Sequence, residues 1–496
     1  MNFRILSKVL GLLLLLLGLA MAVCGLFARL DGVQAEGQAV SALLVSAGVT
    51  AVAAAILIVA GIGRIERIPR REGVAIVGLG WILSTIFGAL PFILCPPHLS
   101  WPQAIFESSS GFTTTGSTVI GDLAAWPRGL LLWRGVTQWL GGIGILVLFV
   151  AVLSYLGVGS KSLFRNESSF QAGEASTARI RDTAMTLLRI YLGISLTCML
   201  GLRAFGLSWY DAVSHAMTTV STGGFSPHNA SLGYYSGWGN GWAIELWISL
   251  FMVVCSLNFL IYAVIIRRRW SRLKDEDDAR WFIGICTLIA VGIAAGLALD
   301  ERYSVGFAGA LRESWFVVVS IASTTGFGTA DYELWPAWCQ ALLAILMVVG
   351  GCSGSTAGGM KVSRLIVFLK SSAHEVIRAF RPNQVFRMVV NGNPIDGDVR
   401  ARTTSFVALY LLIIAVGSVV VGIFEAGHGI KLETCLAAVL ATLSNIGPGF
   451  GDLGPTDNFS GLREPTLVVL SGLMILGRLE LFAILVLFVP AAWRRY

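Results

Sequence analysis

Long apolar stretches separated by short polar ones dominate the chain, and their lengths predict ten membrane-spanning helices. A helix rises about 1.5 Å per residue, so about 20 apolar residues cover the hydrocarbon core of a bilayer. The stretches that reach this length lie at about 5–28, 39–63, 73–95, 128–157, 183–206, 241–266, 280–299, 336–370, 404–426 and 466–491. The first continues to Phe27, beyond the length of a signal-peptide core, so we interpret it as a membrane helix.

Four shorter, semi-polar segments lie between these stretches, near 101–112, 210–221, 311–323 and 432–443. A helix of about 12 residues is only about 18 Å long and does not cross a bilayer. We expect each segment to enter the membrane as a half-helix and to return on the same side. The predicted fold is an all-α, polytopic membrane protein.

Composition supports this class, because 55% of the 496 residues are hydrophobic and only 13% are charged. Soluble domains carry about 25% charged residues. The net charge of +7 does not indicate a nucleic-acid partner, because the basic residues cluster in short loops between apolar stretches. The eight cysteines are scattered singly, without the spacing of a disulfide framework or a zinc site.

The distribution of basic residues predicts the orientation in the membrane. If the half-helices enter from outside, 26 of the 36 Lys and Arg residues fall in cytoplasmic loops or at the termini. Cytoplasmic loops of membrane proteins are enriched in these residues. We therefore predict that both termini face the cytoplasm.

Each half-helix ends in a similar stretch, which predicts four repeats of span, half-helix, loop and span. The four stretches are Thr113-Thr114-Thr115-Gly116, Val220-Ser221-Thr222-Gly223, Ser323-Thr324-Thr325-Gly326 and Ser444-Asn445-Ile446-Gly447. Asp122 and Trp126 follow the first stretch with the same internal spacing as Asp331 and Trp335 follow the third. We divide the chain into an N-terminal two-helix hairpin (1–70) and four pore repeats (71–160, 179–270, 279–372 and 399–496).

Converging loops of this kind are suited to conducting a cation. Non-helical backbone inside a membrane must be buried in protein or line a water-filled path. Its free carbonyl oxygens can then replace the hydration shell of a cation, and glycine permits the backbone torsions that this requires. The negative ends of the half-helix dipoles also favour a cation. Acidic residues near the loops either concentrate cations or are ordinary loop charges: Glu107, Asp122, Asp211, Glu313, Asp331, Glu433 and Asp452.

The stretch at 336–370 is interrupted by a glycine run that we expect to form a flexible loop rather than a helix. The run is Gly350-Gly351-Cys352-Ser353-Gly354-Ser355-Thr356-Ala357-Gly358-Gly359, followed closely by Lys361. It lacks the GxxxxGK[ST] order of a phosphate-binding loop. Arg478 lies in the last span, where a charge must be paired or face water and is a candidate functional residue.

The four glycine loops resemble the filter of the TrkH/TrkG/KtrB superfamily of potassium uptake proteins, and the resemblance extends over essentially the whole chain. It implies a pseudo-fourfold pore within one chain, in a homodimer of the bacterial inner membrane, with no enzymatic activity and no organic cofactor. Glycine in all four loops accompanies potassium preference in that family, whereas Asn445-Ile446 departs from the usual threonines. The filter residues, whose backbone carbonyls would bind potassium, are Thr114, Thr115, Gly116, Ser221, Thr222, Gly223, Thr324, Thr325, Gly326, Asn445, Ile446 and Gly447.

The same resemblance implies a gate below the filter and a regulatory partner. The glycine run corresponds to an intramembrane loop that obstructs permeation, and Arg478 would project into the pore as an electrostatic barrier. A structural arginine bound by loop carbonyls is the alternative for Arg478. The predicted gate consists of Gly350, Gly351, Gly354, Gly358, Gly359, Lys361 and Arg478. Family members work with a cytosolic nucleotide-binding regulatory subunit (TrkA-like).

Two other functions remain alternatives on the sequence. A potassium symporter coupled to protons or sodium is the nearer one, although repeats of the same orientation favour channel-like conduction. Gly449-Phe450-Gly451-Asp452 matches the GxGD motif of intramembrane aspartyl proteases, with Asp211 as a second acid. Both aspartates are expected at the outer edge of the membrane, where such a dyad does not belong.

Overall fold

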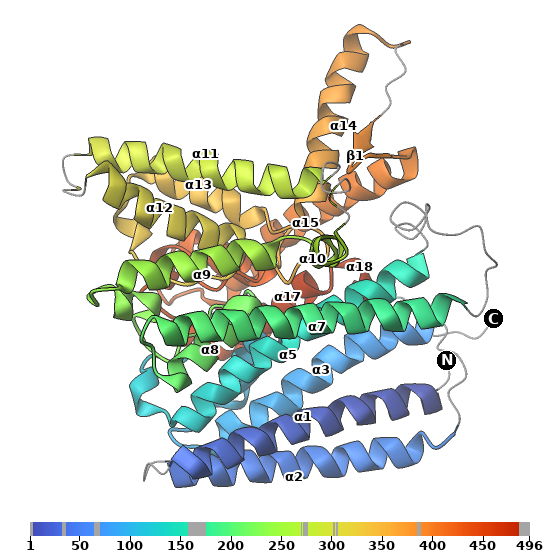
Figure 1. Ribbon diagram of the computed structural model, residues 1–496, viewed down its shortest axis with the longest axis vertical. Coiled ribbons are helices and arrows are strands. Elements are labelled where there is room, and N and C mark those ends of the chain that lie inside the picture. Colours follow the sequence, from blue (N-terminus) through green and yellow to red (C-terminus); the bar gives the residue numbers. More distant parts are fainter. Residues whose placement is uncertain are drawn as a thin grey trace.

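The computed structural model describes residues 3–31, 36–63, 70–156, 175–268, 270, 276–300, 303, 306–383 and 388–485. These residues form helices and loops, with one short antiparallel pair of strands, β1 (Val389–Val390) and β2 (Asn393–Pro394). The longest helices run roughly alongside one another, and α14 extends beyond the bundle (Figure 1). Several predicted inner-loop residues, including Lys161, Arg165 and Arg494, lie outside the described residues.

Seven of the ten predicted spans are single long helices. Within the described residues, six of these helices are long and apolar enough to cross a membrane, and the bent pair α9–α10 would add a seventh such span. The single helices are α1 (Phe3–Asp31), α2 (Glu36–Ala60), α3 (Arg70–Leu94), α5 (Arg128–Leu156), α7 (Ala175–Ala204), α11 (Asp277–Leu299) and α15 (Gly397–Phe424).

The other three predicted spans are broken helices, of which the sequence predicted only one. The pairs are α9 (Gly241–Ser256) with α10 (Phe259–Ile266), α13 (Ala337–Val348) with α14 (Val362–Phe380), and α17 (Glu464–Arg478) with α18 (Phe482–Leu485). The first pair is bent by 93° at Asn258, whose side chain accepts a hydrogen bond from the Leu260 N–H and caps α10. The third breaks where Glu480 and Leu481 adopt φ of 57° and 58°. Neither break contains glycine or proline, which is why the apolar pattern predicted continuous spans.

The four predicted half-helices are all present, as α4 (Trp101–Phe112), α8 (Trp209–Val220), α12 (Phe307–Ala322) and α16 (Leu432–Ser444). Short 3-10 turns lie in the loops that follow them: η1 (Leu123–Ala125), η2 (Ser231–Tyr235), η4 (Tyr332–Leu334), η5 (Gly451–Leu453) and η6 (Phe459–Gly461). The repeated Asp122 and Asp331 serve the same purpose, because each carboxylate accepts a hydrogen bond from the N–H two residues later and caps its turn.

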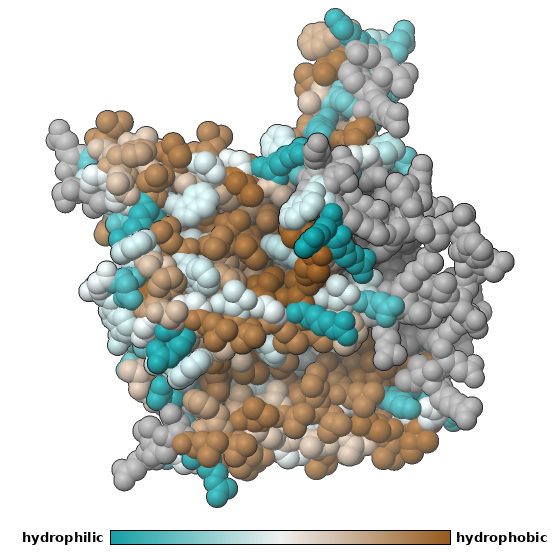
Figure 2. Space-filling model, viewed as in Figure 1, coloured by the Kyte–Doolittle hydropathy of each residue, from teal (hydrophilic) through white to brown (hydrophobic). Residues whose placement is uncertain are grey.

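The two N-terminal helices pack closely because small residues face each other. Gly11, Gly18 and Gly25 recur every seven residues along α1. A methyl group added to Gly11 would lie 2.8 Å from the Ile58 side chain, and one added to Gly18 would lie 3.2 Å from the Ala47 carbonyl oxygen. Close backbone approach of this kind is the usual basis of helix pairing in lipid. The outer faces of this pair are predominantly apolar (Figure 2).

A buried carboxylate connects this hairpin to the rest of the bundle. Glu36, at the start of α2, is only 2% exposed. Its two oxygens accept hydrogen bonds of 2.6 Å from the Arg128 N–H and 3.1 Å from the Gly129 N–H. These are unsatisfied donors at the N-terminus of α5, where a negative charge is favourable. Glu36 therefore fixes the hairpin against α5.

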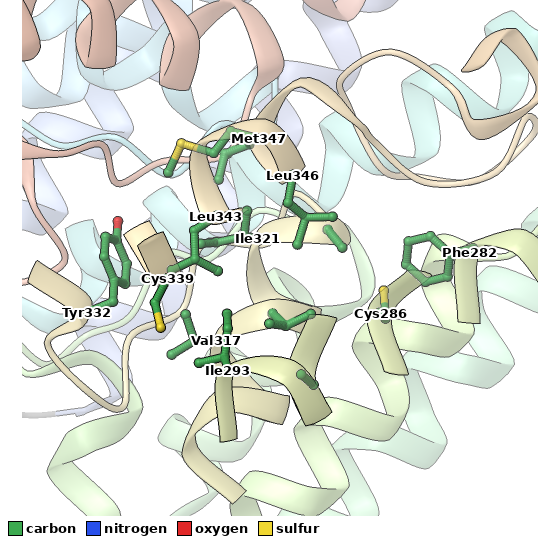
Figure 3. Close-up of a cluster of buried hydrophobic side chains, with 14 of the residues drawn as sticks. Phe282, Cys286, Ile293, Val317, Ile321, Tyr332, Cys339, Leu343, Leu346 and Met347 are labelled. Carbon is green, nitrogen blue, oxygen red and sulfur yellow. The ribbon is translucent and has the colours of Figure 1, made fainter. Parts of the chain in front are cut away.

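Apolar clusters hold the half-helices between their neighbouring helices. In the largest cluster, Ile293 of α11 lies beside Val317 of α12, Leu343 of α13 lies close to them, and Phe282 lies farther along α11, near Cys286 (Figure 3). This cluster extends to Ile446, in the loop that follows α16. The packing of one half-helix is thereby continuous with the loop of the next.

Candidate functional site

The four loops that follow the half-helices share one backbone conformation. We call them loop 1 (113–119), loop 2 (221–227), loop 3 (323–329) and loop 4 (444–450). Near the start of each, one residue adopts a left-handed conformation with φ between 53° and 56°: Thr114, Thr222, Thr324 and Asn445. The next N–H donates to a carbonyl five residues earlier, over 2.8 to 3.0 Å, as in helix C-caps of the Schellman type: Thr115 to Ser110, Gly223 to Thr218, Thr325 to Ser320 and Ile446 to Ala441.

This shared conformation corrects the predicted register of loop 2. Two residues after the left-handed position, each loop has a glycine with positive φ: Gly116, Gly224, Gly326 and Gly447. Gly224, not Gly223, is therefore equivalent to the other three glycines, and Gly223 corresponds to Thr115. The sequence comparison aligned the first glycine after threonine, and loop 2 alone has two consecutive glycines there.

Contacts between the loops form a closed ring. A methyl group added to the positive-φ glycine of each loop would collide with or closely approach a carbonyl oxygen of the next loop in chain order. The distances from the added methyl carbon to the carbonyl oxygen are 2.3 Å for Gly116 and Gly223, 1.8 Å for Gly224 and Thr325, 1.9 Å for Gly326 and Ile446, and 3.0 Å for Gly447 and Thr115. Loop 4 thus returns to loop 1. Four loops far apart in sequence are arranged around one centre.

Two side-chain oxygens at the half-helix end of this ring have no hydrogen-bond partner among the described residues. They are Thr114 Oγ1 and Asn445 Oδ1, and both residues are fully buried. Of the two equivalent side chains, Thr222 donates to the Ser221 carbonyl, and Thr324 Oγ1 accepts a 2.6 Å hydrogen bond from the Gly358 N–H. Buried oxygen acceptors without a donor fit a cation that has lost its water.

The departure of loop 4 from threonine has a structural reason. Asn445 occupies the left-handed position, which asparagine adopts more readily than most residues. Its amide donates hydrogen bonds of 2.9 Å to Thr115 Oγ1 and 2.9 Å to the Met474 carbonyl. Ser117 of loop 1 also donates to the Gly447 carbonyl over 2.8 Å. Loops 4 and 1 are thus joined by side chains as well as by packing.

The glycine loop, residues 349–361, lies against the half-helix end of the ring. The Gly358 N–H donates to Thr324 of loop 3, and Thr356 Oγ1 donates to the Val220 carbonyl at the end of α8 over 3.1 Å. A methyl group on Gly358 would lie 2.7 Å from the Ser444 carbonyl oxygen of loop 4. The loop therefore contacts the ends of three of the four half-helices.

The break between α9 and α10 receives the other side of the glycine loop. The Cys352 N–H donates to the Ser256 carbonyl over 2.8 Å, and the Phe259 N–H donates to the Gly354 carbonyl over 3.0 Å. The bend that the sequence did not predict thus exposes backbone groups that bind the loop. The glycines serve close packing: a methyl group on Gly350 would lie 2.0 Å from the Gly358 carbonyl oxygen.

The two predicted basic gate residues bind the same loop. Arg478, 2% exposed at the end of α17, donates from Nη1 to the Thr356 carbonyl over 2.7 Å. Its Nε and Nη2 atoms have no partner within the described part of the chain. Lys361 Nζ donates to the Ala357 carbonyl. Carbonyl binding, the structural alternative, therefore accounts for one of the three guanidinium nitrogens.

Comparisons with known proteins show the family to which this chain belongs. The model of the TrkH family, described as a cation transport protein, matches residues 53–294 and 300–495. The chain belongs to the TrkH family. The TrkH family relatives named "Trk system potassium uptake protein TrkH" include those of Halomonas elongata, 36% identical, and Escherichia coli K12, 33% identical, each over 100% of both chains. The crystal structure of the potassium transporter TrkH from Vibrio parahaemolyticus matches with a TM-score of 0.88 at 32% identity, also over 100% of both chains.

The predicted family is therefore confirmed, and with it a multi-pass membrane protein whose TrkH relatives are named as transport proteins rather than enzymes. The two aspartates of the protease alternative have separate partners. Asp452 accepts from Thr434 Oγ1 over 3.0 Å, whereas Asp211 accepts from Ser208 and pairs with His228 over 3.1 Å. Each carboxylate therefore stabilises its own part of the chain, Asp452 in the loop after α16 and Asp211 at the start of α8.

Sequence reasoning missed one buried charge pair in this TrkH-family chain. It placed Glu107 among the acidic residues near the loops and gave it no partner. Glu107 is instead fully buried in α4, and its Oε1 lies 2.7 Å from Nε of Arg134, which is 2% exposed in α5. The available signal was one acidic and one basic residue in adjacent membrane segments, since such charges are stable mainly as pairs.

Proposed function

We propose that this chain takes up potassium across the bacterial inner membrane through a selective pore, with the closed ring of loops 1 to 4 as the selectivity filter. The observation that carries the proposal is the closed order of contacts from Gly116 through Gly224 and Gly326 to Gly447. The relatives' names as potassium uptake proteins support potassium as the cargo. The four pore repeats and the hairpin at 1–70 are part of the same proposal, with both termini in the cytoplasm.

The ion would be held mainly by backbone carbonyls of the predicted filter residues, with Gly224 added to them. Carbonyl oxygens replace the hydration shell without a fixed charge, so a monovalent cation is bound and still released. Thr114 Oγ1 and Asn445 Oδ1 would add ligands where the half-helices end. The half-helix dipoles point their negative ends toward this position and favour a cation there.

The glycine loop and Arg478 would form the gate. The loop lies directly against the filter, and the unpaired guanidinium nitrogens of Arg478 keep a positive charge beside it. A cation leaving the filter would meet both obstacles. Opening therefore requires the loop to move away from Thr324 and Val220, and we propose that a cytosolic nucleotide-binding subunit drives this movement in a homodimer of the chain.

Rubidium uptake into liposomes containing the purified chain tests the cargo. We expect rubidium uptake that potassium suppresses strongly and sodium suppresses weakly. Preference for sodium, or for no monovalent cation, would refute the filter assignment. Channel-like conduction further predicts flux that follows the potassium gradient in either direction and ignores a proton gradient. Uptake that requires a proton or sodium gradient would instead establish the symport alternative.

A further inference from the structure

The pair of Glu107 and Arg134 binds the outer segments of two different loops. Glu107 Oε2 accepts a 3.0 Å hydrogen bond from the Val119 N–H, and both its oxygens lie 3.0 Å from Thr118 Oγ1. Arg134 donates from Nη2 to Thr118 Oγ1 over 3.2 Å and from Nη1 to the Ser226 carbonyl over 3.3 Å. One buried network therefore joins loop 1 to loop 2.

The arginine also packs against loop 2. Its guanidinium carbon lies 3.9 Å from the centre of the Phe225 ring, so the cation rests on the aromatic face. Phe225 directly follows Gly224, the positive-φ glycine of the ring. The planar guanidinium thus contacts carboxylate, hydroxyl, carbonyl and ring together, which an ammonium group does not reproduce.

The place of this network is adjacent to the ring but not within it. Thr118 and Ser226 each lie two residues beyond the ring glycines Gly116 and Gly224. Filter carbonyl positions depend on torsions that these segments hold, and the size of the site and the number of its coordinating carbonyls govern which ion is bound best. Loops 3 and 4 have apolar residues at the positions equivalent to Glu107, namely Val317 and Ala438. At this position, the described residues place a buried charge only in the half-helix that precedes loop 1, and its partner Arg134 extends the contact to loop 2.

We propose that Glu107 and Arg134 are positioning residues for ion selectivity: their buried ion pair fixes loops 1 and 2 at the spacing that favours a potassium-sized ion. The inference rests on the proposed function, since it assigns the pair a part in that filter. Removing the pair should widen or loosen one side of the ring. Sodium, which needs closer oxygen ligands and a more adaptable site, should then compete better.

The test compares variants in the same liposome assay, with rubidium uptake and its competition by sodium as readouts. Glu107→Gln keeps the shape of the side chain but leaves Arg134 without its counter-charge, and we expect the rubidium-to-sodium preference to fall by about tenfold. Because an unpaired buried charge also threatens folding, Glu107→Gln combined with Arg134→Met removes both charges together. That double variant should approach normal thermal stability, because neither charge is left unpaired, yet it should still show the reduced preference.

A second ion pair of the chain provides the matched control. Arg312 of α12 donates to Glu245 of α9 over 2.6 and 2.8 Å, and neither residue hydrogen-bonds to the four loops among the interactions described. Glu245→Gln should leave the rubidium-to-sodium preference unchanged. A double variant at 107 and 134 that folds, conducts rubidium and keeps the normal preference would overturn the inference. Absence of cation uptake by the unmodified chain would instead refute the proposed function itself.

Discussion

Loops 1 and 2 are supported differently from loops 3 and 4, although all four share one backbone conformation. Seven residues before the left-handed position, the first pair has Glu107 and His215, and the second pair has Val317 and Ala438. Glu107 forms the buried pair with Arg134, and His215 Nε2 lies 3.2 Å from Ser226 Oγ. Val317 and Ala438 lie in apolar clusters. This one position in the half-helices is thus a hydrogen-bonding side chain in one half of the molecule and an apolar side chain in the other. Side-chain hydrogen bonds reach loops 3 and 4 from other positions, from Ser320 to the Phe327 carbonyl and from Tyr332 to the Gly449 carbonyl.

The two halves also contribute differently to the half-helix end of the ring. The glycine loop follows α13, the helix after loop 3, and Arg478 ends α17, the helix after loop 4. The corresponding helix after loop 1, α5, is continuous from Arg128 to Leu156. One half of the molecule therefore supports the ring with a buried ion pair, and the other half carries the glycine loop and Arg478, which we propose as the gate. Substitutions in the two halves should differ in kind.

The largest loss of rubidium uptake should come from substitutions of the ring glycines, which occur in all four loops and therefore in both halves of the molecule. In Gly224→Ala and Gly326→Ala, the added methyl would collide with a carbonyl oxygen, and the alanine would be strained at φ of 78°. Strain of about 1 to 3 kcal/mol corresponds to roughly a 5- to 160-fold loss of rubidium uptake. Uptake by liposomes with equal amounts of folded protein measures it.

Gly223→Ala is the control for this prediction and for the corrected register of loop 2. The atoms nearest to a methyl there belong to the Gln138 side-chain amide, at 2.4 Å, rather than to the backbone of another loop, and the φ of Gly223 is not positive. Its effect should be clearly smaller than that of Gly224→Ala. Equal losses in both variants would argue for the register predicted from sequence.

The next largest effect should be a gain of rubidium flux when the buried charge of Arg478 is removed from the half of the molecule that contains loops 3 and 4. Arg478→Ala deletes a guanidinium that binds the glycine loop and has two nitrogens without a partner among the described residues. A unit charge about 4 Å from the ion raises its energy by about 1 to 4 kcal/mol, depending on the effective dielectric constant. Rubidium flux without a regulatory subunit should therefore rise about tenfold. Arg478→Lys, which keeps the charge, should stay near the unmodified rate, and a rise as large as in the alanine variant would contradict the electrostatic role.

The fold was largely predictable because its signals are local and periodic. Apolar length identified seven single helices, and the short semi-polar segments identified all four half-helices within a few residues. The glycine run at 350–359 identified the break between α13 and α14 for the same reason, since it disfavours a helix wherever it occurs. The breaks at Asn258 and Glu480 were not predictable in this way. They depend on groups far away in sequence that bind the exposed backbone, such as Gly354 at the first break.

The sequence predicted which residues form the candidate site, but not which of them contact one another. The motif identified the residues of the ring. In loop 2, however, the sequence alone does not tell whether Gly223 or Gly224 matches the glycines of the other loops, and only the backbone torsions distinguish the two. The pairing of Glu107 with Arg134 depends on how α4 packs against α5, which no spacing along the chain specifies. For the same reason the pattern did not show that Asn445 bridges loops 4 and 1.

A smaller gain of rubidium flux should follow from loosening the C-terminal end of the glycine loop, where α14 begins. Arg364, in the first turn of α14, donates to Glu480, in the turn after Arg478, and its guanidinium lies 4.0 Å from the centre of the Phe406 ring. The pair thus connects the start of α14, directly after the glycine loop, to the break between α17 and α18. Glu480→Gln should raise basal rubidium flux about two- to fivefold, because partly exposed ion pairs contribute only about 0 to 1 kcal/mol.

A double-mutant cycle identifies whether the two residues act together. Arg364→Gln should give a similar rise, and the variant with both substitutions should rise no further than either one. Arg400, paired with Glu375 on the same part of the chain, offers a control, because Glu375→Gln should leave the flux unchanged. Independent, multiplying effects of the substitutions at 364 and 480 would show that the pair does not hold the gate.

The smallest effect on transport should come from the apolar support in the half of loops 3 and 4. Val317 is 2% exposed in α12, and Val317→Ala leaves a small cavity in the cluster between α11, α12 and α13. Such a cavity lowers stability by about 1 to 3 kcal/mol and removes no hydrogen bond or charge. The melting temperature should fall while the rubidium-to-sodium preference stays constant, the opposite of the double substitution at Glu107 and Arg134. Equal losses of preference in the two cases would mean that loop position is sensitive to any disturbance behind the half-helices, and that the charged and apolar supports are not distinct.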